Sequence, residues 1–308
     1  MSEVIPEDVI EFAREIFAAA NSEATMTLAR QPAAHEEHLD FQLFAALDRI
    51  GPRIVPISKS SIEVDTHWLG GRRFWDGRWE IADIGVVVVL RRAGRLVWRK
   101  VALLQSKRLY SREIPVVELE RSDYEIGIGR LVDRTEAIPT RTQPRTFEFT
   151  PECVYGAMAA ASHQVKIIED YMRRHQMPVY YSLYNPPAMP YWGVVPRNAA
   201  FPLGQENIPL GCRVMTAQET HEALARLPIG RTPQFQELVV MASPASTDAY
   251  RNHGWRLESF IADELLRCRQ GRLFDRDNDS DLHALLYERT APIASLIQIS
   301  IDLLPETP

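Results

Sequence analysis

The sequence predicts an α/β protein, and three observations carry that prediction. A buried hairpin dominates the middle of the chain: residues 84–90 form a continuous apolar, β-branched run, and residues 96–107 rise again after an Ala93-Gly94 turn. Helices are predicted before and after this hairpin, over residues 36–50 and 150–177. The second helix leads into an apolar strand over residues 179–184, an order that fits helices covering a sheet.

The part of the chain before the hairpin is predicted to be mostly helical. Apolar residues at helical spacing predict a helix over residues 6–20, and residues 21–32 follow as a polar connector. The next helix buries a stripe made up of Leu39, Leu43, Leu47 and Ile50. The aromatic, glycine-rich stretch over residues 68–75 is interpreted as a hairpin that caps the core, in preference to a stacking surface for nucleic acid.

The part after the hairpin alternates loops with short elements. Residues 114–149 are predicted to be irregular, and residues 185–209 to be a proline-rich connector. Strands are expected over residues 212–215, 237–241 and 293–301, and helices over residues 217–227 and 255–269. We therefore divide the chain into an N-terminal helix and connector (1–34), a core (35–200) and a C-terminal α/β extension packed on the core (201–308).

The composition is that of an ordinary globular protein. With 308 residues, of which 45% are hydrophobic and 25% charged, the chain has room for one large or two ordinary domains. No apolar run is long enough to span a membrane, and the acidic N-terminus is unlike a signal peptide. Its three cysteines lie far apart without metal-binding spacing, so we expect a reducing, cytoplasmic setting. The sequence also lacks the glycine-rich nucleotide motifs and the GxSxG motif of serine hydrolases.

Polar residues gather at the open end of the predicted hairpin. Asp83 opens the first strand, and Gln105 and Lys107 close the second, both pointing to one face because alternate residues of a strand share a face. A three-residue loop would place Asp83 opposite Gln105. A two-residue loop would place it opposite Leu104 and turn Gln105 to the other face.

These residue types suit phosphate chemistry at a metal. Asp83 and the Gln105 side-chain carbonyl can ligate a hard divalent cation, while Lys107 can bind a phosphate or help to position an attacking water. Glu36 and Glu37, in the first turn of the upstream helix, are further candidates. The competing interpretation is that the strand end meets water and that the two glutamates complement the helix dipole.

With Glu36 or Glu37, then Asp83, then Gln105-x-Lys107, the sequence resembles the PD-(D/E)XK nuclease superfamily over about a quarter of its length. It departs from the family pattern in having Gln at 105 and Ala82 before Asp83. The resemblance implies a restriction-endonuclease-like central mixed β-sheet flanked by helices, with residues 35–200 as the nuclease core. It also implies a Mg²⁺-dependent endonuclease, with Mn²⁺ as an alternative ion and Asp83, Gln105 and Glu37 as metal ligands.

DNA is favoured over RNA as the substrate on the same resemblance, but the net charge of −6 argues against tight constitutive binding to nucleic acid. Residues 91–112 carry eight Lys and Arg and no acid, and the candidates for weak phosphate contacts are Arg91, Arg92, Lys100 and Arg108. We therefore expect an activating protein partner or a homo-oligomer, as in the nuclease effectors of bacterial anti-phage defence that the chain resembles. The alternative is a catalytically silent subunit of the same fold that binds nucleic acid or acts as a scaffold.

Overall fold

The computed structural model describes residues 4–69, 81–114, 145–195, 199–202, 210–240, 250–274, 280, 282–283 and 293–305. The helices are α1 (Glu7–Arg30), α2 (Glu36–Leu47), α3 (His163–His175), α4 (Ala217–Leu224) and α5 (Leu257–Ser259), which continues as a π-helical segment over Phe260–Leu265. The strands of the main sheet are β1 (Arg53–Ile54), β2 (Ser61–Trp68), β3 (Ala82–Arg92), β4 (Arg95–Tyr110), β7 (Val154–Tyr155), β8 (Val179–Tyr184), β11 (Arg213–Thr216), β12 (Trp255–Arg256), β13 (Arg272–Phe274) and β14 (Ile293–Leu303). A smaller sheet contains β5 (Arg112–Ile114), β6 (Arg145–Phe149), β9 (Tyr191–Val195) and β10 (Ala199–Pro202).

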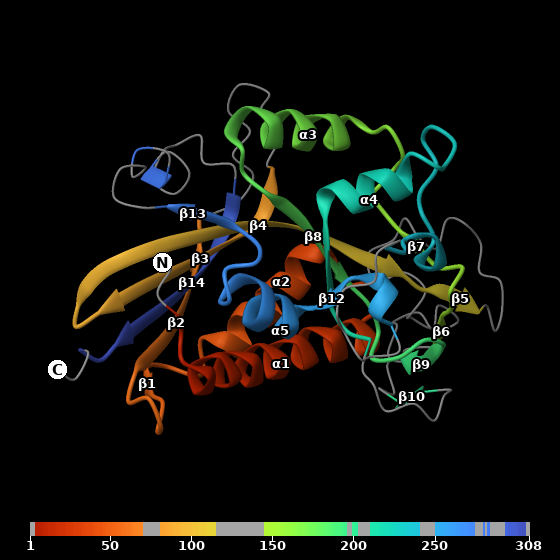
Figure 1. Cartoon of the computed structure of the whole chain (residues 1–308). Coiled ribbons are helices and arrows are strands. Elements are labelled where there is room, and N and C mark those ends of the chain that lie inside the picture. Colours follow the sequence, from red (N-terminus) through yellow and green to blue (C-terminus); the bar gives the residue numbers. More distant parts are fainter. Residues whose placement is uncertain are drawn as a thin grey trace.

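The main sheet is mixed and has helices on both faces. Its strands run in the order β1-β2-β14-β3-β4-β8-β11-β12, and β7 and β13 pair with β4 off this path. The pairs β14–β3 and β4–β8 are parallel, whereas β3–β4 and β14–β2 are antiparallel. Helices α1, α2 and α5 lie on one side of the sheet, and α3 and α4 lie on the other (Figure 1). The predicted α/β class, with a mixed central sheet flanked by helices, is confirmed.

The β3–β4 hairpin reaches the expected register by an unexpected route. Arg92 pairs with Arg95, so the loop has two residues, and Ala93 and Gly94 both adopt positive φ angles. A bulge at Val97 then shifts the pairing by one residue, so that Ile84 lies opposite Leu104. Asp83 is therefore aligned with Gln105, as the three-residue loop would have placed it.

The last strand of the chain lies in the middle of the main sheet. Strand β14 alternates buried and partly exposed residues, pairs antiparallel with β2 and runs parallel to β3. Strands β11 and β12 also belong to this sheet. The domain boundary expected at residue 200 therefore does not coincide with a boundary of the sheet.

Helix α1 is longer than predicted, because its C-terminal half is stabilised by tertiary contacts. The expected connector over residues 21–32 is instead helical as far as Arg30. The Asn21 amide donates to Glu258 Oε2 at 2.8 Å, and its carbonyl accepts from the Cys212 backbone N–H at 2.8 Å. Partners remote in sequence thus satisfy a polar side chain that looked like part of a loop.

The helix predicted from Thr150 begins thirteen residues later, at His163, where Ser162 is the N-cap and accepts from the Val165 N–H. Residues before it form β7, which pairs with the end of β4. A Cβ at Gly156 would lie 2.2 Å from the Tyr110 ring, so the chain passes that ring too closely for a larger residue. The apparent helical stripe over 154–161 was therefore a wrong prediction.

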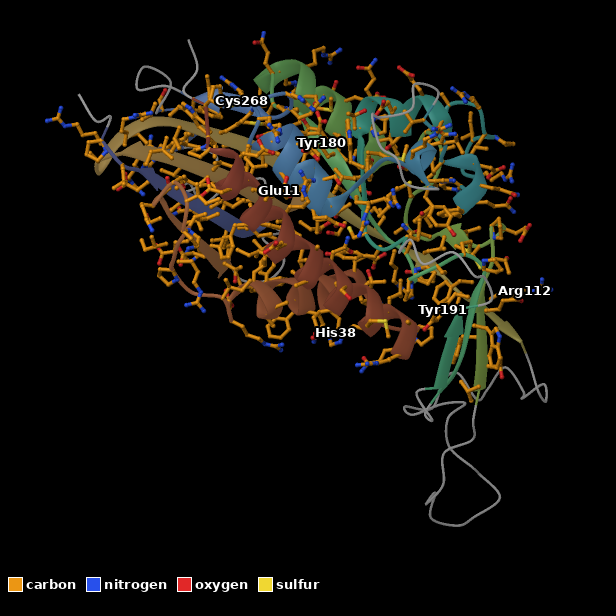
Figure 2. All side chains as sticks on the ribbon, turned by 60° about the horizontal axis from the view of Figure 1, so that its bottom comes forward. Glu11, His38, Arg112, Tyr180, Tyr191 and Cys268 are labelled. Atoms are coloured by element: carbon orange, nitrogen blue, oxygen red, sulfur yellow. The ribbon has the colours of Figure 1, made fainter. Side chains whose placement is uncertain are left out.

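Other predictions are corrected in the second half of the chain. The supposed connector over 185–209 contains β9 and β10, whose small sheet projects from one end of the molecule, with Arg112 and Tyr191 at its base (Figure 2). The strand predicted over 237–241 is absent from its described part, residues 237–240, where a 3₁₀ turn over Phe235–Glu237 ends. The helix predicted over 255–269 is divided between β12, α5 and the π-helical segment.

Several other expectations concern parts of the chain that are only partly described. Most of the aromatic stretch 68–75 and of the segment 114–149 lies outside the described residues.

The three cysteines Cys153, Cys212 and Cys268 are free. Within the described part of the chain, no helix combines the length and the apolar character needed to cross a bilayer.

Candidate functional site

Asp83 lies where strands β3 and β4 separate. The Gln105 side-chain amide donates to Asp83 Oδ2, which confirms that these two residues face each other. The Ser106 backbone N–H donates to the same oxygen at 2.7 Å. Beyond Leu104, β4 has no partner in β3 but continues beside β8. The Asp83 carboxylate thus replaces the missing strand partner.

The side chains at the end of β4 point to opposite faces of the sheet. Ser106 Oγ donates to Asp40 Oδ1 of α2 at 2.8 Å, and Arg108 donates to the Pro32 carbonyl just before α2 at 2.5 Å. Gln105 and Lys107 therefore point to the other face, which carries α3 and α4. Both are buried, with exposed fractions of 4% and 6%. The Lys107 ammonium has no ion pair or hydrogen bond with the residues that the structure describes.

The two glutamates of α2 occupy different environments. Glu37 is exposed on the first helical turn, whereas Glu36 is half-buried and one turn before Asp40. Glu36 Oε1 is buried without a hydrogen-bond partner, and its charge acts on Asp40. The structure thus favours Glu36 over Glu37 as the helical acid of the candidate site.

Asp40 is the residue that sequence reasoning missed. It is fully buried, and its Oδ1 accepts hydrogen bonds from Ser106 and, at 2.7 Å, from the Tyr184 hydroxyl. Burial and the charges of Asp83 and Glu36 raise the pKa of Asp40 to about 8, although the two hydrogen bonds lower it. The signal was an aspartate next to Leu39 at the edge of an apolar stripe, where an acid is uncommon.

The four candidates for phosphate contacts are not placed around Asp83. Lys100 and Arg108 are buried, with exposed fractions of 2% and 4%, and the Arg108 guanidinium stacks on the Tyr110 ring. Arg91 and Arg92 lie at the hairpin tip, roughly 25–30 Å from Asp83 along the strand. Among the basic residues predicted to contact phosphate, Lys107 is therefore the one that lies closest to Asp83 in strand register.

The oxygen donors at this strand end are of the type that Mg²⁺ binds. Asp83 supplies a carboxylate and Gln105 an amide oxygen, and Gln105 Oε1 is buried without a hydrogen-bond donor. Glu36 Oε1 is also buried without a donor, but it belongs to α2 on the other face of the sheet. A cation would satisfy such orphaned acceptors. Among the described residues, however, no three His, Cys, Asp or Glu side chains have a metal-holding arrangement. A metal here would depend on the Gln105 carbonyl in addition to carboxylates.

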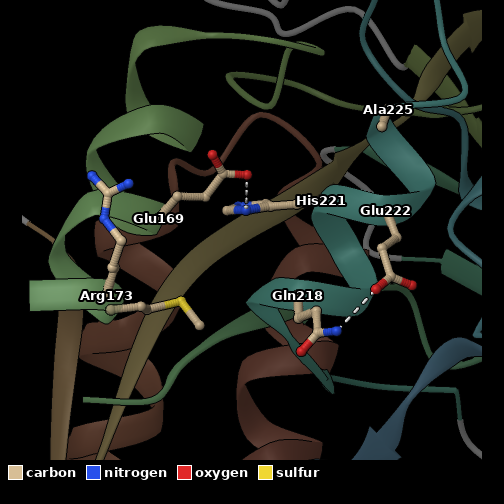
Figure 3. Close-up of a pocket in the computed structure, with 7 residues that line it drawn as sticks. Glu169, Arg173, Gln218, His221, Glu222 and Ala225 are labelled. Carbon is tan, nitrogen blue, oxygen red and sulfur yellow. Dashed lines mark hydrogen bonds and ion pairs between the residues drawn. The ribbon is translucent and has the colours of Figure 1, made fainter. Parts of the chain in front are cut away.

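An open groove of about 540 Å³ lies between α3 and α4, and Asp83 does not line it (Figure 3). On its wall His221 Nδ1 lies 3.2 Å from Glu169 Oε1, and His221 Nε2 lies 3.0 Å from the Tyr181 hydroxyl. Burial lowers the pKa of His221, while Glu169 opposes that shift. Because both ring nitrogens have partners, this histidine joins α3, α4 and β8 and has no nitrogen left for a ligand.

Comparisons with known proteins assign no relative: no family model, no curated protein and no solved structure matches the chain. The fold and the strand-end geometry therefore define it as an α/β protein with a mixed, helix-flanked sheet and a buried polar cluster around Asp83.

Proposed function

We propose that this protein is a metal-dependent nuclease that hydrolyses phosphodiester bonds, with DNA favoured over RNA. The observation that carries the proposal is the direct contact between Asp83 and Gln105 at the point where β3 and β4 separate. Lys107 follows on the same face of β4, and Glu36 belongs to α2, where its charge acts on Asp40 on the other face. These are the positions at which the sequence resembles the PD-(D/E)XK pattern.

In the proposed reaction a water oxygen attacks phosphorus and the bond from phosphorus to one sugar oxygen breaks. The water loses a proton, and the departing sugar oxygen gains one. Asp83 and Gln105 would hold Mg²⁺ or Mn²⁺, which would neutralise charge that develops on the phosphate. The Lys107 ammonium, with no carboxylate partner among the described residues, is suited to bind a phosphate oxygen and stabilise that charge.

The placement of the basic residues supports a dependence on a partner. Two of the four phosphate candidates are buried, the other two are distant, and the net charge is −6. Attraction of a polyanion by this chain alone is therefore weak. We include in the proposal an activating protein or a homo-oligomer that completes the nucleic-acid surface, and a place in bacterial anti-phage defence.

A catalytically silent subunit is the second candidate, and one observation favours it. Asp83 Oδ2 already accepts two hydrogen bonds, from Gln105 and from the Ser106 N–H, so this oxygen is satisfied without a metal. A subunit of this kind would bind nucleic acid or organise a complex without cleaving it.

The test is cleavage of plasmid DNA, single-stranded DNA and RNA in Mg²⁺, Mn²⁺ or EDTA. Lys107→Ala and Asp83→Asn should each lower metal-dependent cleavage about 100-fold or more, because each removes a charge from the reacting site. The matched controls are Lys166→Ala on the exposed side of α3 and Asp48→Asn at the end of α2, and both should cleave as the wild type does.

Cleavage that survives Lys107→Ala would place the active site elsewhere. Silence of the wild type, alone and with the proteins encoded beside it, together with no metal binding by calorimetry, would favour the silent subunit.

A further inference from the structure

A buried polar network is connected to Asp83 through Ser106 and lies on the face of the sheet that α2 covers (Figure 1). Asp40 Oδ1 accepts from Ser106 Oγ at 2.8 Å and from the Tyr184 hydroxyl at 2.7 Å. Ser106 Oγ also lies 3.0 Å from Ser182 Oγ on the neighbouring strand. Each of these four residues is 1% exposed, so water does not compete for their hydrogen bonds.

Ser106 connects this network to the candidate site through its main chain. Its side chain is held by α2 and β8, while its backbone N–H donates to Asp83 Oδ2 at 2.7 Å. Because β4 no longer pairs with β3 at this position, Asp83 is the acceptor that the Ser106 N–H has on that side. The place of the Asp83 carboxylate therefore depends on where Ser106 is held.

Burial of this polar network costs free energy of folding that packing alone would not require. Burial of a carboxyl group disfavours its charged form, and an apolar side chain at position 40 would join the buried Leu39 and Leu43 without that cost. Asp40 can, however, accept two directed hydrogen bonds at once, which an apolar residue cannot. It thereby fixes β4 and β8 relative to α2 at one point.

We propose that Asp40 is a positioning residue that acts through Ser106 to hold Asp83 in place beside Gln105. The inference takes the importance of Asp83 from the proposed nuclease function, but the contacts that it invokes are independent of any reaction. It differs from the metal-ligand roles considered above, because Asp40 contacts Ser106 and Tyr184 and is not required to bind a substrate or an ion.

The test is amide hydrogen exchange at Ser106, followed by NMR in the full-length protein. In the wild type this amide should be protected although it lies outside the β3–β4 ladder, and Asp83→Ala should abolish that protection. Asp40→Ala should raise the Ser106 exchange rate at least tenfold. Asp40→Asn should leave it within twofold, because the asparagine carbonyl still accepts both hydrogen bonds.

The controls separate positioning from general loosening. Asp48→Ala changes the same residue type on the exposed end of α2, where Asp48 accepts from Thr66, and should not alter Ser106 exchange. Ser106→Ala removes the hydroxyl but keeps the backbone amide whose exchange is measured. It should raise the exchange rate by the same factor, and it replaces Asp40→Ala as the test if that variant does not fold. Amides of β14 should keep their wild-type rates in every variant.

The proposal is overturned if Asp40→Ala and Ser106→Ala leave the residue-106 amide protected, or if they raise exchange in β14 equally. Metal-dependent cleavage is measured on the same proteins. A wild type that shows the predicted exchange pattern would support the positioning role even if it neither binds metal nor cleaves nucleic acid, alone or with the proteins encoded beside it. That second result would count against the nuclease alone, so the two proposals fail separately.

Discussion

Replacement of Asp40 by asparagine is expected to change how the stability of the protein depends on pH. The folded state holds the Asp40 proton up to a pKa of about 8, whereas the ordinary value for aspartate is 3.8. Between these values the unfolded chain loses a proton that the folded chain retains, so rising pH favours unfolding. The contribution of Asp40 to the free energy of unfolding is therefore greatest below pH 4, and it decreases steadily as the pH rises to about 8.

The magnitude follows from this linkage. One proton bound differentially changes the free energy of unfolding by about 1.4 kcal/mol per pH unit. Between pH 5 and pH 7 the wild type should therefore lose about 3 kcal/mol relative to Asp40→Asn, which has no proton to release there. Because the other titrating groups are common to both proteins, the difference between them isolates Asp40.

Urea unfolding followed by tryptophan fluorescence at pH 5, 6, 7 and 8 measures this difference. Asp48→Asn provides the control, since it makes the same Asp-to-Asn change at an exposed position at the end of α2. A difference between wild type and Asp40→Asn that stays constant from pH 5 to pH 8 would refute the buried, protonated Asp40.

Three other predictions concern the scaffold. Burial lowers the pKa of His221 below 6.5, so the wild type should lose stability as pH falls below 6.5, and His221→Gln should lose less between pH 7 and pH 5 in urea titrations. Arg14 donates to both Asp263 oxygens at 2.7 and 2.8 Å, and Arg14→Met should lower the free energy of unfolding by about 1 kcal/mol in low salt and by less in 1 M NaCl. Gly254 has a φ of 89° and a Cβ there would lie 2.4 Å from the Val214 carbonyl oxygen, so Gly254→Ala should cost roughly 2–3 kcal/mol. Gly51→Ala, at a φ of 60° with open space around it, should lower the free energy of unfolding by less. Calorimetry on both variants measures the two losses, and equal losses would contradict the steric argument.

Local sequence patterns were sufficient to predict the central strands of the main sheet. The run 84–90 and the strand 179–184 are recognisable because they are buried on both faces and need no alternation. Their neighbour 96–107 is buried on both faces from Lys100 onward. The alignment of Asp83 with Gln105 was also predictable as one of two registers. The choice between them was not, because the register depends on the bulge at Val97 as well as on the loop length.

Tertiary contacts decided what local patterns could not. The extension of α1 past Asn21 depends on Glu258 and Cys212, which lie more than 190 residues away in the sequence. The position of β14 between β2 and β3 likewise brings residues 293–303 beside residues 61–92.

The sequence by itself determined the α/β class and brought Asp83, Gln105 and Lys107 to one strand end, because strand periodicity and hairpin pairing are local properties. Only the tertiary structure decided that Glu36 rather than Glu37 faces inward, that Lys100 and Arg108 are buried, and that Asp40 meets Ser106 and Tyr184 behind the site. Those outcomes depend on how helix α2 is seated against β4 and β8, and no short-range pattern encodes that packing.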